Sequence, residues 1–384
     1  MKHVLLLSCN TGAGHNSCAR AIKECFEARG VECEIADSLL FISKKASKFI
    51  CNWHVRIYRH LPRLFKNGYK EVESHASPFQ KDSVIYQYLT SGSEHMYDYI
   101  SARGFDTVIC THIFPALALT DMLEKHPMQI KTAFVGTDYT CSPGTADSDL
   151  EYYFIPDASL TEEFAACGVP RERIVPSGMP ARPDFYIPCD PADTAAAKRH
   201  IGIPHEHRHI LMMCGSMGCG PIIELTQQLA GRLASDEELT IICGTNEKLY
   251  EKLQLEYFAV ANIHVEGLVD DMPTYMRSAD IYMTKPGGLS TTEAAAMGLP
   301  MVLINAVAGC EEHNLEFFTE HGGAVTADTP EALADAAAAL LHDGARLDAM
   351  HRALKQDREC TPAECIYKIL NGNEKDCFSQ LYFG

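Results

Sequence analysis

Short apolar runs alternate with amphipathic helical segments along most of this chain. In the first run, residues 3–8, the four central positions are Val or Leu, and the run is too short for a core helix, which predicts a fully buried parallel strand. An amphipathic segment over residues 17–28 follows and ends near Gly30, and a second apolar run covers residues 31–36. Strand, helix and strand in this order predict a β-α-β unit of an α/β fold.

The same alternation continues in two series. Further strands are predicted over residues 107–110, 130–135, 153–155, 209–214, 239–243, 263–266, 281–284 and 301–304, and helices over 84–102, 161–167, 330–341 and 357–371. Between the series, residues 182–191 carry Pro183, Pro188 and Pro191, which indicates a linker. We therefore expect two doubly wound, Rossmann-like domains, residues 1–185 and 192–356. The helix over 357–371 can pack back on the first domain.

Composition narrows the class of protein. The 384 residues are enough for two domains, and 46% hydrophobic with 22% charged residues is ordinary for a globular protein. The N-terminal apolar run is too short for a signal peptide, and no apolar run reaches the roughly 18 residues that span a bilayer. Sixteen cysteines lie singly, without CxxC spacing, which predicts reduced thiols and no metal site.

The charge of the chain is unevenly distributed. A formal net charge of −18 argues against nucleic-acid binding. Residues 38–70, however, contain no acidic residue, and aromatic residues such as Trp53 lie among basic ones, including Lys44, Lys45, Lys48, Arg56, Arg59 and Arg63. Such a segment suits a helix in an anionic membrane interface. The alternative is a solvated helix with its aromatic side chains packed inward, and the absence of Asp and Glu favours the membrane interpretation.

Polar residues follow several predicted strands. The first strand enters the sequence CNTGAGH, whose GxG spacing lacks the third glycine of a nicotinamide or flavin site. His15 ends this loop and is either a helix cap or a general base, since imidazole titrates near neutral pH. His112 and Asp138 also follow strands, on the side where open α/β sheets bind ligands. Each is equally compatible with a cap or turn role.

Glycine-rich turns follow two strands of the second series. One has the sequence GSMGCG over residues 215–220, and the other has KPGG over residues 285–288. Glycines at a strand-to-helix turn let a diphosphate approach the backbone, where the N–H groups and the dipole of the helix favour anions. The second turn and the polar residues 311–314 therefore predict a nucleotide-sugar site.

Several motifs together resemble a known family. The stretch from residue 267 to 314, GLVDDMPTYMRSADIYMTKPGGLSTTEAAAMGLPMVLINAVAGCEEHN, resembles the donor half of glycosyltransferase family 28, and within it monogalactosyldiacylglycerol synthases and bacterial processive diacylglycerol glucosyltransferases. The loop at residues 12–15, the Thr137-Asp138-Tyr139 turn and Gly178-Met179-Pro180 are similar as well. The resemblance implies the GT-B fold, with two Rossmann-like domains facing a central cleft.

The resemblance also implies an activity. It is that of an inverting transferase, which moves a hexose, glucose or galactose, from a UDP-sugar to diacylglycerol or a similar membrane lipid. Such an enzyme needs no cofactor and no metal, and we expect it in the cytoplasm, peripheral on the inner face of the cell membrane. His15 is then the catalytic base, with Asp138 in the same catalytic region.

For the donor the resemblance implies a set of contacts. Gly287, Gly288 and the helix near Ser290 would hold the diphosphate, and Leu268 and Val269 the uracil. Glu311 and Asn314 would contact sugar hydroxyls, and the remaining residues expected near the donor are Gly14, Ser216 and Met217. Glu293 has two interpretations, because STTE over residues 290–293 has capping-box spacing while relatives use a glutamate here for the ribose.

The chain departs from the family pattern at a few positions. Cys310 replaces the usual glutamine, Ala308 the usual proline, and the histidine and tryptophan expected after Asp138 are missing. The sequence therefore leaves the hexose and the acceptor open. Three alternatives remain: a transferase of the same fold with a polyprenyl-linked or soluble acceptor, an isomerase like the UDP-N-acetylglucosamine 2-epimerases, and a non-catalytic UDP-sugar sensor.

Overall fold

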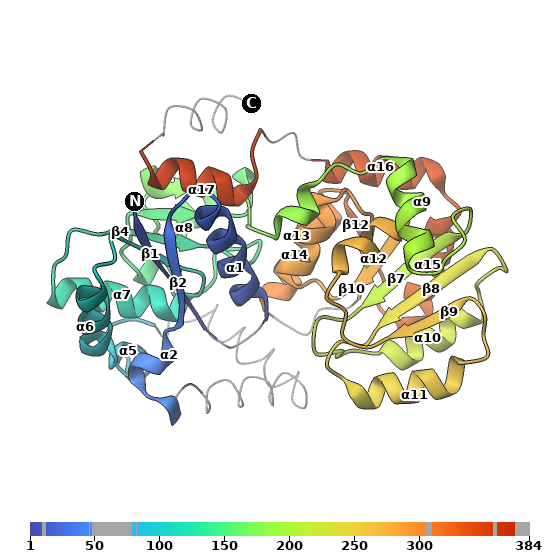
Figure 1. The fold of residues 1–384 in the computed structure, drawn as a ribbon, viewed down its shortest axis with the longest axis horizontal. Helices are drawn as coiled ribbons and strands as arrows, with labels where there is room; N and C mark the ends of the chain where they lie inside the picture. Colours follow the sequence, from blue (N-terminus) through green and yellow to red (C-terminus); the bar gives the residue numbers. More distant parts are fainter. Residues whose placement is uncertain are drawn as a thin grey trace. The chain divides into compact units, whose positions relative to one another are not determined.

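The chain forms two compact units, each built around one six-stranded sheet (Figure 1). The computed structural model describes residues 1–9, 13–45, 47, 79–81, 83–304, 309–355 and 359–372. The first unit begins at Met1, ends at Pro183 and takes in the C-terminal helix α17 (Pro362–Leu370). The second begins at Asp184 and holds the elements from α9 (Pro191–His200) to α16 (Gly344–Leu354).

The sheet of the first unit is parallel throughout, in the order β2-β1-β3-β4-β5-β6. Its strands are β1 (His3–Ser8), β2 (Glu32–Asp37), β3 (Thr107–Cys110), β4 (Lys131–Val135), β5 (Tyr152–Phe154) and β6 (Ile174–Val175). The chain goes from β1 to β2 in one direction and then places β3 on the other side of β1. The strand order thus reverses between β1 and β3, and a reversal of this kind opens a ligand-binding crevice at the carboxyl ends of the two strands.

The second sheet repeats this plan in the order β12-β11-β10-β7-β8-β9, again with parallel strands. Its strands are β7 (Arg208–Met213), β8 (Glu237–Ile242), β9 (Ile263–Glu266), β10 (Ile281–Thr284), β11 (Met301–Leu303) and β12 (Ala324–Thr326). Here the order reverses between β7 and β10. The loops after these two strands are the glycine-rich turns GSMGCG and KPGG.

Helices connect the strands of both sheets. In the first unit they are α1 (Ala13–Glu27), α2 (Leu39–Ile42), α5 (Val84–Thr90), α6 (Ser93–Arg103), α7 (Ile113–Lys125) and α8 (Thr161–Ala166). In the second, besides α9 and α16, they are α10 (Ile222–Ala230), α11 (Glu247–Tyr257), α12 (Met272–Ser278), α13 (Gly288–Ala296), α14 (Cys310–Glu320) and α15 (Pro330–Leu341). In the part of the chain described, no helix is long and apolar enough to cross a membrane.

The last helix completes the core of the first unit. The apolar face of α17, including the fully buried Ile366 and Ile369, joins one hydrophobic cluster with Ile22 and Phe26 of α1. Thr361 and Glu364 form a capping box at its start, and Glu364 also pairs with Arg29. In Figure 1 the red α17 accordingly lies beside the blue α1.

Three sequence predictions about the elements need correction. The single helix expected over residues 84–102 is two helices, α5 and α6. Gly92, the N-cap of α6, lies between them, and a Cβ there would be 2.7 Å from the backbone carbonyl carbon of Phe41. The expected linker over residues 182–191 contains a 3-10 helix, η4 (Pro183–Tyr186), and its last residue, Pro191, already begins α9. The edge strand β12 was not predicted, because its three residues, Ala324–Thr326, are too short for a periodic signal.

Candidate functional site

The loops at the carboxyl ends of β1, β3 and β4 bring together three polar residues of the first unit: His15, Thr111 and Thr137. His15 lies in the first turn of α1 and is half-buried. Its Nδ1 is 2.8 Å from the carbonyl oxygen of Thr111, just after β3, and 3.0 Å from Oγ1 of Thr137, after β4. The Thr111 hydroxyl in turn donates to the carbonyl oxygen of His15 at 3.1 Å.

These contacts define the protonation pattern of neutral His15. A carbonyl oxygen only accepts hydrogen bonds, so the Nδ1 that contacts Thr111 must carry the proton. In that tautomer the basic lone pair is on Nε2. The arrangement matches a general base whose orientation is set through its second ring nitrogen.

A second histidine lies against the first. The rings of His15 and His112 meet edge to face, with centroids 4.6 Å apart. His112 is the N-cap of α7, and its Nδ1 accepts the backbone N–H of Phe114 at 3.0 Å. Neutral His112 therefore carries its proton on Nε2, the opposite tautomer to that of His15. The cap interpretation of His112 from sequence is confirmed.

Asp138 follows Thr137 in the same loop and is partly exposed. The loop begins at Gly136, whose N–H donates to the carbonyl oxygen of Phe154 on the neighbouring strand. Beyond Asp138, the Glu163 carboxylate accepts from the Thr140 hydroxyl at 2.6 Å and from the Cys141 N–H at 2.7 Å. Asp138 thus stands in a loop fixed at both ends, at the sheet edge that carries His15.

In the second unit the turn after β7 packs tightly on the loop after β8. A Cβ on Gly218 would lie 2.2 Å from the Cys243 carbonyl oxygen, and one on Gly244 would lie 2.3 Å from the Ser216 carbonyl oxygen. Both glycines have positive φ, +55° and +59°. Asn246 adds a hydrogen bond from Nδ2 to the Gly218 carbonyl oxygen at 3.0 Å. The predicted residues Ser216 and Met217 are therefore displayed by a turn with a defined backbone path.

The turn after β10 ends in the start of α13. Gly287 is its N-cap and has no side chain to bond the first-turn N–H groups of Gly288, Leu289 and Ser290. Since the helix begins at Gly288, Ser290 lies inside its first turn, and of the two interpretations of Glu293 the capping box over residues 290–293 is wrong. Glu293 instead lies near the buried Tyr282, whose pKa is raised by burial and then by this negative charge.

The first turn of α14 contacts the turn after β10. Nζ of Lys285 lies 3.5 Å from Oε1 of Glu311, and Nδ2 of Asn314 donates to the Pro286 carbonyl oxygen at 3.0 Å. Glu311 and Asn314 are three residues apart in a helix, so they share one face. Asn314 is fully buried, which makes it a support for the turn. Lys285 was absent from the predicted site. Its position directly before the Pro-Gly-Gly turn was the sequence signal that could have identified it.

The two predicted uracil contacts lie in the loop after β9. Leu268 keeps 65% of its surface exposed, unusually for a leucine, and Val269 is half-buried. An apolar side chain exposed at the carboxyl end of a strand is available to a flat base. Gly14 is the second residue of α1 in the first unit, next to His15.

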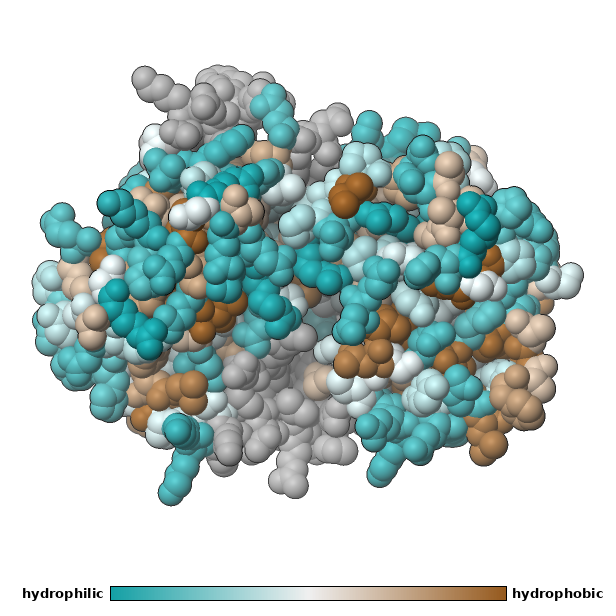
Figure 2. All heavy atoms as spheres, viewed as in Figure 1, coloured by the Kyte–Doolittle hydropathy of each residue, from teal (hydrophilic) through white to brown (hydrophobic). Residues whose placement is uncertain are grey.

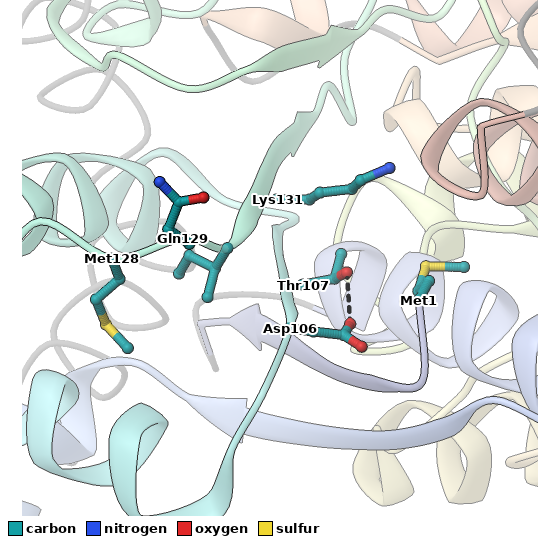
Figure 3. Close-up of a pocket in the computed structure, with 7 residues that line it drawn as sticks. Met1, Asp106, Thr107, Met128, Gln129 and Lys131 are labelled. Atoms are coloured by element: carbon teal, nitrogen blue, oxygen red, sulfur yellow. Dashed lines mark hydrogen bonds between the residues drawn. The ribbon is translucent and has the colours of Figure 1, made fainter.

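Other polar features lie at the opposite, amino ends of the strands. Figure 3 shows a hollow there in the first unit, where Asp106 accepts from the Thr107 hydroxyl and Lys131 extends from β4. In the second unit, His207 and His264 both contact the buried carboxylate of Glu238, at 2.8 and 2.7 Å. No group of three or more His, Cys, Asp or Glu side chains is placed to hold a metal in the described parts of either unit.

The predicted membrane segment is only partly described. Lys44 and Lys45 are exposed just after α2, whereas Lys48, Trp53, Arg56, Arg59 and Arg63 lie outside the described residues. Exposed apolar side chains of α2 and α5 accompany these lysines: Leu40, Val84, Ile85 and Tyr88. Figure 2 shows hydrophobic groups at the lower edge of the first unit, where Figure 1 draws α2 and α5.

Two family models match the chain, one for each sheet. A model described as monogalactosyldiacylglycerol (MGDG) synthase matches residues 15–181, and one described as glycosyltransferase family 28 C-terminal domain matches residues 209–361. The first match begins at His15 and includes β3, and the second begins within β7 and includes β10 and the KPGG turn. The chain thus carries a glycosyltransferase family 28 C-terminal domain, preceded by a segment that matches the MGDG synthase model. It is a glycosyltransferase, as its motifs predicted.

Curated relatives match the chain over nearly its whole length. A processive diacylglycerol beta-glucosyltransferase of Staphylococcus saprophyticus is 25% identical over 361 residues, which is 93% of this chain and 89% of the relative. One of the same description from Bacillus pumilus is 25% identical over 363 residues, 92% of this chain and 90% of the relative. The predicted likeness to such enzymes is thereby confirmed.

Solved structures share the fold. The crystal structure of Acinetobacter baumannii MurG has a TM-score of 0.63 at 14% identity, covering 97% of this chain and 99% of that one. A UDP co-structure of S. aureus MnaA has a TM-score of 0.62 at 15% identity, covering 98% and 97%. Together with the two parallel sheets, these likenesses confirm the predicted α/β, GT-B fold.

Proposed function

We propose that this glycosyltransferase transfers a hexose from a UDP-sugar to diacylglycerol or a similar membrane lipid. The observation that carries the proposal is the environment of His15: its Nδ1 is bonded to the Thr111 carbonyl oxygen at the crevice between β1 and β3. That bond places the basic lone pair on Nε2 and holds the ring at the sheet edge where ligands bind. The names of the curated relatives, diacylglycerol beta-glucosyltransferases, support the substrate pair.

In the proposed reaction the acceptor hydroxyl loses its proton to Nε2 of His15. The hydroxyl oxygen forms a bond to the anomeric carbon, and the bond from that carbon to the β-phosphate oxygen breaks. The bonding electrons leave with UDP, and attack from the opposite face inverts the configuration. A positioned base contributes typically about 10²- to 10⁴-fold to such a step. Asp138, in the loop after β4, is proposed to act within the same region.

The second unit is proposed to bind the donor. The first-turn N–H groups of α13, next to the turn at Gly287 and Gly288, favour the diphosphate because they are partly positive and have no side-chain cap. The turn carrying Ser216 and Met217 borders the same switch point. Uracil would rest against Leu268 and Val269. A ribose contact for Glu293 gains support because the capping role is excluded.

The acceptor is proposed to reach the first unit from a membrane surface. Exposed apolar groups on α2 and α5 lie in the same unit as Lys44 and Lys45, and this combination suits an anionic bilayer. The acid-free segment 38–70 extends the same chemistry along the sequence. We therefore propose that the enzyme acts in the cytoplasm, at the inner face of the cell membrane.

A donor-by-acceptor assay tests the proposal. The purified chain is incubated with radiolabelled UDP-glucose or UDP-galactose and vesicles of anionic phospholipid that contain diacylglycerol. Label that appears in a glycolipid, and depends on diacylglycerol, is the expected result. Label transferred only to a polyprenyl-linked or soluble acceptor would contradict the lipid assignment. Epimerised sugar without acceptor would indicate an isomerase, and UDP binding without any transfer would indicate a sensor.

A further inference from the structure

Lys285 is a buried cation at the carboxyl end of β10. The residue keeps only 8% of its surface exposed, and its ammonium group pairs with Glu311, whose side chain is 12% exposed. Burying an ammonium group costs several kcal/mol unless it is paired. A positive charge maintained at such a cost, at the edge of the sheet where ligands bind, calls for a function.

The side chain of Lys285 extends toward the neighbouring turn. A Cβ built on Gly215, the first residue after Cys214, would lie 4.0 Å from Cε of Lys285. Burial raises the pKa of the Cys214 thiol to about 12, and the charge of Lys285 opposes that rise. Both observations place the ammonium group between the turns after β7 and β10, and therefore at the switch point of the second sheet.

The contact between Lys285 and Glu311 is loose. Its N–O distance of 3.5 Å exceeds the roughly 2.7–2.9 Å of a strong charge-assisted hydrogen bond. Glu311 also lies in the first turn of α14, where the helix dipole stabilises a carboxylate without any lysine. The bond from Asn314 to the Pro286 carbonyl oxygen holds α14 against the turn independently of the pair. Lys285 can therefore exchange its partner at little cost and without disturbing the backbone.

We propose that Lys285 binds the β-phosphate of the donor, and that this contact replaces its pair with Glu311. The inference rests on the proposed UDP-sugar function. Its orientation follows from Glu311, the residue expected at the sugar hydroxyls: a cation 3.5 Å from that carboxylate lies at the sugar end of the diphosphate. As the bond from the sugar to the β-phosphate breaks, negative charge grows on that phosphate, and the ammonium group stabilises it. Glu311, released from Lys285, accepts hydrogen bonds from the hexose.

Calorimetric binding of UDP and UMP to the full chain tests the inference without relying on turnover. Lys285→Met should weaken UDP binding about 10- to 100-fold, the value of a charged hydrogen bond, and leave UMP binding within about twofold. Glu311→Gln should leave UDP binding equal or tighter, because it removes the competing partner. It should weaken UDP-hexose relative to UDP. The double variant should show the UDP loss of Lys285→Met alone.

Lys198→Met is the matched control. Lys198 is another buried lysine of the same unit, 3.0 Å from Asp280 at the amino ends of the strands, and its loss should not change the ratio of UDP to UMP affinity. Lys285→Arg keeps the charge should Lys285→Met fold poorly, and it should keep that ratio within about threefold. The inference would be overturned if Lys285→Met left the ratio of UDP to UMP affinity unchanged, or if Lys198→Met lowered that ratio as well. A wild-type chain that binds no UDP would instead refute the proposed function.

Discussion

His15 and Thr111 are joined in both directions. Nδ1 of His15 lies 2.8 Å from the carbonyl oxygen of Thr111, and the Thr111 hydroxyl donates to the carbonyl oxygen of His15 at 3.1 Å. The first turn of α1 is thereby tied to the end of β3 across the point where the strand order reverses. Backbone and imidazole are fixed together, so the base needs little reorganisation before it takes a proton.

Replacing the base should remove the reaction and keep the fold. We expect His15→Gln to lower kcat for transfer into lipid by about 10²- to 10⁴-fold, because Gln fills much of the space of His but is no base at neutral pH. The measurement is radiolabel in extracted lipid, with UDP binding as a check on the donor half. His126→Gln, at the far end of α7, is the matched control and should stay near wild type. Full activity in His15→Gln would refute the assignment.

The neighbouring histidine has a structural role that can be measured separately. His112→Ala removes the N-cap of α7 and should reduce the free energy of unfolding by about 1 kcal/mol. His112→Asn replaces the accepting nitrogen with an amide oxygen and should recover most of that loss. Urea unfolding followed by circular dichroism distinguishes the two variants. Equal loss in both would show that the hydrogen bond to Phe114 contributes little.

The turn before α13 allows ligand binding to be separated from folding. Gly287 has negative φ, and a Cβ there would meet nothing within 4 Å, so Gly287→Ala should leave stability unchanged. The same methyl group would stand where a diphosphate approaches the backbone, so UDP affinity should fall at least about tenfold. Gly344→Ala, also in open space, is the control.

Gly218→Ala should behave in the opposite way. Its φ of +55° and a clash 2.2 Å from the Cys243 carbonyl oxygen affect the folded chain itself. The left-handed backbone alone costs about 1–2 kcal/mol. Thermal unfolding and UDP calorimetry on both variants check the contrast. Loss of stability in Gly287→Ala with retained UDP binding would contradict the proposed diphosphate position.

A core histidine predicts acid sensitivity. His209 is fully buried between Ser278 and Thr240, and burial, aided by the charges of Lys198 and His264, lowers its pKa from 6.5 to about 3. The unfolded chain binds this proton below pH 6.5 and the folded chain does not. Stability should therefore fall as the pH drops from about 6.5 to about 3, by up to about 1.4 kcal/mol per pH unit from this residue.

Urea unfolding at several pH values measures that dependence. His209→Asn should flatten the slope of the unfolding free energy against pH, whereas His200→Asn, at an exposed position of the same unit, should leave it unchanged. A slope that is identical in His209→Asn and wild type would show that the histidine is not the source.

Much of the fold could be predicted from the sequence because the signals are local. Strands β1, β3, β9 and β10 have the bounds expected from their apolar runs. Errors arose where segments distant in the sequence meet, as at Gly92 between α5 and α6, which packs against the backbone of Phe41. The capping box at residues 290–293 failed for a related reason, since its spacing fits any helix that begins at Ser290, and this one begins at Gly288.

The candidate site divides in the same way. Sequence motifs predicted His15, the KPGG turn and the polar residues near 311, because glycines and polar residues that follow apolar strands can be recognised directly in the sequence. The contacts of Lys285 with Glu311 and of Asn314 with Pro286 join residues 26 and 28 positions apart, and no periodicity predicts them. The bond between His15 and Thr111 joins residues 96 positions apart.

By itself the sequence determined that two series of parallel strands and helices exist and which turns between them are rich in glycine. Local hydrophobic period and turn chemistry are sufficient for that. Only the tertiary structure decided the strand orders, and hence that β1 and β3, and β7 and β10, border the two switch points. Strand order depends on which buried faces pack together across long loops. The free energy of that packing is gained only when the whole core of a unit has assembled, so no local stretch of sequence specifies it.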